Sequence, residues 1–253
     1  MSKKQFYSIG LLICLFVLFT SIPFDLWITN ETVVYVLQMI LKIGFLILAI
    51  FYIKKEGYRY EWNGKLQWKH SILLPFLLLC FSNLVVCLIQ SSPMKDIQDY
   101  HGIVMDFFFY LLVAVSEELV FRYVLYQELQ THQGKLKAML ISSMIFGGLH
   151  LLNINSLASI PTCLVQSLYT FGLGMVLSLV YMDTKNLSVI ILFHFLFNFM
   201  NDSLVSNLFD MEWDVTFYVI NSIFAVVFLV YGGMIYLCKI RKEKEDVTEY
   251  LDH

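Results

Sequence analysis

Long apolar stretches alternate with short polar ones along the whole chain. Eight stretches come close to the roughly 20 apolar residues that a helix needs to cross the hydrocarbon layer of a membrane; they are 6–27, 32–53, 71–90, 104–127, 138–153, 162–182, 187–201 and 215–238. The fifth and the seventh are short, as suits helices that surround a polar interior. The pattern predicts an all-α, polytopic bundle of about eight transmembrane helices, with residues 1–253 forming one membrane domain.

The positions of the basic residues predict how the bundle is oriented. With the N-terminus inside, all but three of the 17 Lys and Arg residues lie in cytoplasmic segments; the exceptions are Lys95 in an outer loop, and Lys42 and Arg122 within helices. Cytoplasmic loops of membrane proteins are enriched in Lys and Arg. We therefore expect both termini in the cytoplasm, with residues 239–253 as a charged cytoplasmic tail.

Composition supports the same prediction and excludes other classes of protein. Hydrophobic residues make up 58% of the chain, charged residues only 15%, and the mean hydropathy is +0.70. A soluble domain carries about 25% charged residues, so lipid must cover most of this surface. The sequence offers no basic face for nucleic acid. Its five cysteines stand singly in apolar segments, where packing is their expected role.

The fourth apolar stretch carries two adjacent acids and an arginine. Charged groups within a membrane cost at least about 2.5–3.5 kcal/mol each and mark functional positions. Glu118 and Arg122 are four residues apart and can pair on one helix face. Glu117 is turned about 100° away, so it is expected to project elsewhere and to act as a base. A structural ion pair with a spare acid is the alternative.

Two further stretches carry imidazole and amide groups at helical spacing. Phe146 and His150 share a face of the fifth stretch, beside two glycines that permit close helix packing. His194 and Asn198 share a face of the seventh. Taken alone, each pair is equally consistent with ordinary hydrogen bonds between helices.

Depth in the membrane brings these groups together. At 1.5 Å per residue from the cytoplasmic ends, Glu117, His150, His194 and Asn198 come out at about 10–18 Å. Three helices thus bring polar groups to one layer, which predicts a single site. A carboxylate and an imidazole can deprotonate water, while a second imidazole and an amide can stabilise an oxyanion. Hydrolysis of a peptide bond fits this set.

These residues resemble a known family, the CAAX protease and bacteriocin-processing family of membrane proteases, which are similar to the Ras-converting type of CAAX endopeptidase. The resemblance covers about residues 104–201, a motif-bearing catalytic core, and it rests on three ordered motifs: Glu117-Glu118-x-x-x-Arg122, Phe146-x-x-x-His150 and His194-x-x-x-Asn198.

The resemblance implies a role for each catalytic residue. Glu117, assisted by His150, would activate water, and His194 with Asn198 would stabilise the oxyanion. The family implies a glutamate-dependent mechanism without a cofactor. The implied substrate is a membrane-associated peptide or protein, and bacterial relatives are associated with bacteriocin immunity, peptide maturation or signalling. The expected location is a bacterial cytoplasmic membrane.

The resemblance also implies supporting residues. Glu118 and Arg122 would orient the site, and Phe146 would pack beside it. The remaining polar residues within the predicted spans have plainer expected roles. Lys42 would snorkel or pair with a lipid phosphate, and Gly172 and Gly174 would allow tight packing.

Other functions remain open at this point. A zinc ion could bind Glu117, His150 and His194. The protein could instead be a non-catalytic immunity protein that binds a bacteriocin, or a proton-coupled transporter that uses the same residues as a relay. The sequence shows no internal repeat of the kind found in many transporters.

Overall fold

The computed structural model describes residues 3–58, 73–95, 100–154, 156 and 159–251, with the helix path alone from residue 239 onward. Within these ranges the chain is helical, apart from one isolated bridge between Met94 and Phe209. This confirms the all-α prediction. Five helices are long and apolar enough to cross a membrane: Glu31–Lys55, Lys135–Asn153, Ile160–Thr184, Leu187–Leu208 and Val215–Cys238. The eight-span count and the cytoplasmic termini stay predictions. The expected inner loop with Arg59, Lys65 and Lys69 lies outside the described residues.

The helices follow the predicted segments in order. Their bounds are α1 Lys3–Thr20, α2 Glu31–Lys55, α3 Leu74–Leu77, α4 Ser82–Gln90, α5 His101–Glu118, α6 Gln127–Gln133, α7 Lys135–Leu149, α8 Ile160–Thr184, α9 Leu187–Asn198, α10 Val205–Leu208 and α11 Val215–Leu251. Shorter helical turns join them, namely η1 Phe24–Leu26, η3 Leu78–Phe81, η4 Leu119–Tyr126, η5 His150–Asn153 and η7 Phe199–Leu204.

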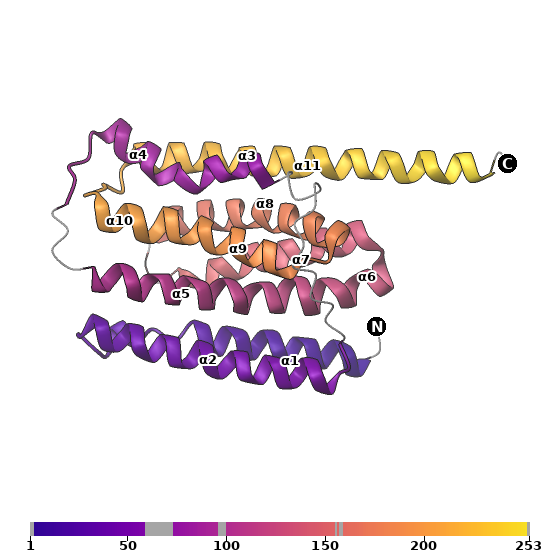
Figure 1. The fold of residues 1–253 in the computed structure, drawn as a ribbon, viewed down its shortest axis with the longest axis horizontal. Helices are drawn as coiled ribbons and strands as arrows, with labels where there is room; N and C mark the ends of the chain where they lie inside the picture. Colours follow the sequence, from indigo (N-terminus) through magenta and orange to yellow (C-terminus); the bar gives the residue numbers. More distant parts are fainter. Residues whose placement is uncertain (1–2, 59–72, 96–99, 155, 157–158, 252–253) are drawn as a thin grey trace.

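The motif-bearing helices lie in the middle of the bundle. The α1–α2 hairpin packs along one side, where α2 contacts α5, and α11 packs along the other side against α8 and α4 (Figure 1). Between them, α5 contacts α9 and α7 contacts α8. The start of α1 and the end of α11 lie toward the same end of the bundle (Figure 1). The central helices are therefore shielded on both sides.

Two helix ends differ from the prediction. The first helix ends at Thr20 instead of residue 27, because Pro23 cannot continue a helix and restricts the residue before it. The last helix runs on to Leu251, through the segment predicted as a charged tail.

Two of the three motif helices contain a π-helical turn, which begins directly after Glu118 in one and directly after Asn198 in the other. The helix of α5 passes without a break into η4, which has π-helical hydrogen bonding, and α9 passes in the same way into η7. A π-helical turn accommodates extra residues, and such turns are frequent at functional sites. Residues beyond each turn therefore face different directions from those that a regular α-helix would give.

The two glycines beside His150 have different surroundings. A Cβ atom at Gly147 would lie 2.8 Å from the backbone oxygen of Ser167 and 2.9 Å from the Cβ atom of Phe171, both on α8. A Cβ atom at Gly148 would meet no atom within 4 Å. Close approach of α7 and α8 thus depends on Gly147, and the predicted packing role of Gly148 is wrong.

Candidate active site

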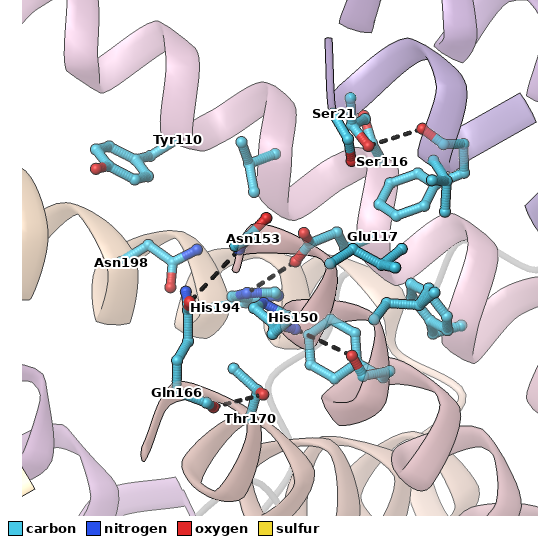
Figure 2. Close-up of a pocket in the computed structure, with 18 of the residues that line it drawn as sticks. Ser21, Tyr110, Ser116, Glu117, His150, Asn153, Gln166, Thr170, His194 and Asn198 are labelled. Carbon is cyan, nitrogen blue, oxygen red and sulfur yellow. Dashed lines mark hydrogen bonds and ion pairs between the residues drawn. The ribbon is translucent and has the colours of Figure 1, made fainter. Parts of the chain in front are cut away.

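A cavity of about 290 Å³ opens between the central helices and the α1–α2 hairpin. The four residues predicted as catalytic, Glu117, His150, His194 and Asn198, all line it (Figure 2). They come from α5, from the end of α7 and from α9. The structure therefore brings together the groups that the sequence placed at one depth.

Glu118 and Arg122 form a buried ion pair next to this cavity. Their side chains are 0% and 1% exposed, and the Arg122 Nη1 atom lies 2.9 Å from the Glu118 Oε1 atom. The guanidinium carbon lies 4.4 Å from the centre of the Phe146 ring, a cation–π contact. The absence of a side chain at Gly174 leaves space for the guanidinium group, since a Cβ atom there would lie 3.0 Å from the Nη2 atom of Arg122.

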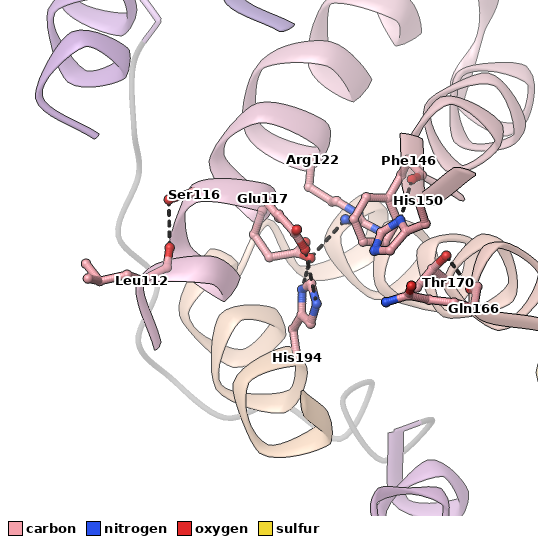
Figure 3. A network of polar contacts seen from close by, with 10 residues as sticks. Leu112, Ser116, Glu117, Arg122, Phe146, His150, Gln166, Thr170 and His194 are labelled. Atoms are coloured by element: carbon pink, nitrogen blue, oxygen red, sulfur yellow. Dashed lines mark hydrogen bonds and ion pairs between the residues drawn. The ribbon is translucent and has the colours of Figure 1, made fainter. Parts of the chain in front are cut away.

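The two ring nitrogen atoms of His194 contact the two adjacent acids, and Figure 3 shows the ring directed toward Glu117. Its Nδ1 atom is 2.7 Å from Oε1 of Glu118, and its Nε2 atom is 3.4 Å from Oε2 of Glu117. Glu117 differs from Glu118 in that it lines the cavity and keeps 14% of its side chain exposed. We expected Glu117 to project to a different place from Glu118. This is only partly the case, because the two acids contact the two nitrogen atoms of the same imidazole ring.

The hydrogen bond made by His150 indicates which of its two ring nitrogen atoms carries a proton. The Nδ1 atom lies 3.0 Å from the backbone oxygen of Phe146, one turn earlier on α7. A carbonyl oxygen only accepts hydrogen bonds, so Nδ1 carries the proton and donates it. In the neutral ring, Nε2 then has a free lone pair. Because His150 lines the cavity, this nitrogen is available to an occupant.

The Phe146 ring forms T-shaped contacts with both histidines. Its centre lies 5.2 Å from that of the His150 ring and 5.9 Å from that of the His194 ring, with interplanar angles of 89° and 80°. Phe146 thus covers Arg122 with its face while it fixes the orientation of two imidazoles. The resemblance had implied only that this residue packs beside the site.

The residue one helical turn beyond Asn198 also reaches the cavity. Asp202 lines the cavity, whereas Asn201 lies in a separate buried network, where its Oδ1 atom accepts hydrogen bonds from Ser82 Oγ (2.9 Å) and from the backbone N–H of Asn83 (3.1 Å). The sequence analysis did not single out Asp202. Its spacing of four residues from Asn198 was the available signal.

Lys42 is a further residue that lines the cavity. Its side chain is 4% exposed, which favours a position at the site over snorkelling to the membrane surface. Its ammonium group lies 4.5 Å from the centre of the Phe109 ring. Sequence reasoning also missed several uncharged polar cavity residues, namely Tyr110, Asn153, Tyr169 and Thr170.

The arrangement of ligand-type side chains is relevant to the zinc alternative. Among the described residues, no three His, Cys, Asp or Glu side chains are grouped in a way that could hold a metal ion. Both nitrogens of His194 face carboxylates, and Nδ1 of His150 is bound to a carbonyl oxygen. The set does not have the geometry of the three-ligand zinc site considered from sequence.

Comparison with known proteins finds a family that part of the chain resembles. Residues 100–200 match the family model described as type II CAAX prenyl endopeptidase Rce1-like. This segment contains all three motifs and confirms the family resemblance that those motifs predicted. Residues 100–200 of this multi-pass membrane protein are thus similar to the CAAX-type endopeptidase family. A comparison with the curated proteins finds no significant relative.

Proposed function

We propose that the protein is an intramembrane endopeptidase that hydrolyses a peptide bond in a membrane-associated peptide or protein by means of an activated water molecule. The observation that carries this proposal is the convergence of Glu117, His150, His194 and Asn198 on one cavity within the helix bundle. The family match at residues 100–200 supports the reaction class.

Glu117 and His150 are the groups suited to activate water. Glu117 is the acid that lines the cavity, whereas its neighbour Glu118 is occupied by Arg122 and His194. His150 offers the Nε2 lone pair, because its Nδ1 proton is engaged by the Phe146 carbonyl. A water molecule held by these two groups loses a proton to one of them as its oxygen attacks the peptide carbonyl. The same proton then passes to the departing amine.

His194 and Asn198 are suited to stabilise the oxyanion. The two ring nitrogen atoms of His194 face the Glu118 and Glu117 carboxylates. A proton on the Nε2 atom, on the side of Glu117, can be donated to the negative oxygen that forms on attack. The Asn198 amide supplies a second donor from one turn along α9.

We propose that no metal takes part in the reaction. The arrangement of the side chains supports this, since among the described residues no three His, Cys, Asp or Glu side chains are grouped so that they could hold a metal ion. Elemental analysis of active, purified protein should give no stoichiometric zinc, and a chelator should leave cleavage unchanged. Loss of cleavage on chelation, restored by added zinc, would overturn this part of the proposal.

The experiment that tests the function uses two neighbouring side chains. Cleavage of quenched fluorescent peptides by the detergent-purified protein should fall about 10²–10⁴-fold in Glu117→Gln, since an amide cannot accept the proton from water. Ser116→Ala is the matched control, because Ser116 lines the same cavity but its hydroxyl donates to the Leu112 carbonyl. Cleavage by the Glu117→Gln variant at the rate of the unmodified protein would contradict the proposal.

We further propose that the protein resides in a bacterial cytoplasmic membrane with both termini inside, and that it acts in bacteriocin immunity, peptide maturation or signalling. The loop charges support the orientation. Reporter fusions at the two termini should both report a cytoplasmic position, and a periplasmic signal from either end would contradict this orientation.

Cells that produce the Glu117→Gln variant should lose the immunity, maturation or signalling phenotype that the unmodified protein supports. Full protection against a bacteriocin by this variant would indicate a non-catalytic binding role.

A further inference from the structure

The cavity extends toward the end of the bundle that is remote from the two chain termini. The turn between α1 and α2 and the helix α10 lie at this remote end (Figure 1). Ser21, directly after α1, and Asn153, the last residue of η5, both line the cavity. Asp202 lines it about 9 Å before the end of α10 at Leu208. We call the part of the cavity formed by Ser21, Asn153 and Asp202 its mouth.

The half of the bundle nearer to the termini is tightly packed. Phe121 and His194 are the lining residues nearest to the termini on their helices, and they are 1% and 2% exposed. About 10 Å of helix separates His194 from the start of α9, and about 18 Å separates Phe121 from the end of α6. Tyr126 and Tyr181 fill part of this half, with exposures of 0% and 2% and ring centres 6.2 Å apart. A peptide that came from the side of the termini would have to separate these helices to reach the cavity.

The accessibility of the lining side chains increases toward the mouth. Glu117 is 14% exposed and His194 only 2%, whereas Ser21, Asn153 and Asp202 are all exposed. The three side chains of the mouth are polar, and polar groups are unfavourable in contact with hydrocarbon. They are suited to contact with water and with the polar backbone of a peptide. The burial pattern therefore indicates that the cavity opens at the mouth.

Charges at the helix ends indicate which side of the membrane the mouth faces. Lys54 and Lys55 lie in the last turn of α2, and Lys135 begins α7, both at the end of the bundle that holds the termini. At the remote end, α2 begins with Glu31. Cytoplasmic ends of membrane helices are enriched in Lys and Arg. These charges predict that the mouth faces away from the cytoplasm.

We propose that the cavity opens to the outer side of the membrane and that its substrate is an exported or external peptide, which reaches Glu117 from that side. This inference rests on the proposed function for the reaction and on the proposed orientation for the side. A peptide confined to the cytoplasm is not a substrate, because the packed half of the bundle separates it from the cavity.

Thiol labelling from each side of the membrane tests the opening without requiring cleavage. The five native cysteines are replaced by serine or alanine, and Val113→Cys is introduced into the full chain, because Val113 lines the cavity one turn before Glu117. A membrane-impermeant maleimide should label this cysteine at least about tenfold faster in right-side-out vesicles than in inside-out vesicles, because a thiol must be accessible to react. Asn153→Cys, at the mouth, should show the same preference and replaces the first reporter if Val113→Cys lowers Tm.

A control at the other end of the bundle calibrates the orientation of the vesicles. Lys135→Cys is exposed at the start of α7 and should label faster in inside-out vesicles. Equal labelling of the cavity reporters from both sides, or faster labelling from the cytoplasmic side, would overturn the proposal. Labelling of Lys135→Cys from the outside would also overturn it, because the mouth would then face the cytoplasm.

Cleavage measured from each side separates this inference from the proposed function. A quenched fluorescent peptide with several lysines stays on the side where it is added, because each charge costs at least about 2.5–3.5 kcal/mol within the membrane. Right-side-out vesicles should cleave it, and inside-out vesicles should do so only after detergent is added. Cleavage by intact inside-out vesicles alone would overturn the proposal. Labelling from the outside, together with cleavage in detergent that Glu117→Gln does not reduce, would support the opening and reject the protease mechanism.

Discussion

Two neighbouring regions of this molecule differ in whether their buried charged side chains form ion pairs. In the first, the ion-pair layer formed by Glu118, Arg122 and Phe146, the charged groups are almost fully buried and bind one another. In the second, the cavity, Glu117 and Lys42 line open space, and among the described residues Glu117 has no Lys or Arg partner and Lys42 no carboxylate partner within ion-pair distance. The comparison teaches that pairing, more than burial, separates charges that hold the fold from charges that are available for chemistry.

His194 joins the two regions. One nitrogen binds the paired acid Glu118 and the other faces the cavity acid Glu117. Through this ring, the ion-pair layer fixes the orientation of a group that we assign to catalysis. Damage to the layer should therefore affect both stability and rate, whereas damage on the cavity side should affect the rate alone.

The largest expected effect breaks the ion-pair layer. Arg122→Met should lower the free energy of unfolding by about 3–5 kcal/mol, because it leaves the Glu118 carboxylate buried without its cation. The double variant with Glu118→Gln should recover part of this loss, since it removes the unpaired charge. Denaturant titration in detergent measures both, and equal losses in the single and double variants would show that the pair is not the stabilising unit.

A cavity substitution should leave stability unchanged and slow the reaction. Asn198→Ala should reduce kcat about 10²–10³-fold, or about 2.7–4 kcal/mol, through loss of one oxyanion donor. Gln166→Ala serves as the control, because Gln166 lines the same cavity and has no assigned catalytic role. A drop in Tm that accompanies the slower rate would mean that Asn198 belongs with the ion-pair layer.

The smallest expected effect concerns the helix packing that supports both regions. Gly147→Ala should destabilise the protein by about 1–3 kcal/mol, because its Cβ atom would collide with the backbone of α8. Gly148→Ala, one residue along in open space, should be neutral or stabilising by up to about 1 kcal/mol. Similar Tm values for the two variants would contradict the packing of α7 on α8.

Much of this arrangement could be predicted from the sequence, where local rules apply. The four-residue spacing of Glu118 and Arg122 predicted their ion pair, and the apolar segments predicted the order of the helices. The roles of the site residues remain predictions. Asp202 lies four residues after Asn198 and so on the same helix face, but its position at the cavity was not predicted. The surroundings of Lys42 could not be predicted, because they come from a helix 60 residues and more away in the chain.

The central claim is that Glu117, His150 and His194 meet around one water molecule inside the bundle. An experimental structure in lipid, at a resolution that shows ordered water, tests this most directly. Our account predicts a water within hydrogen-bond distance of both the Glu117 carboxylate and the Nε2 atom of His150. A structure in which these two side chains face apart, or in which protein atoms fill the space between them, would contradict it.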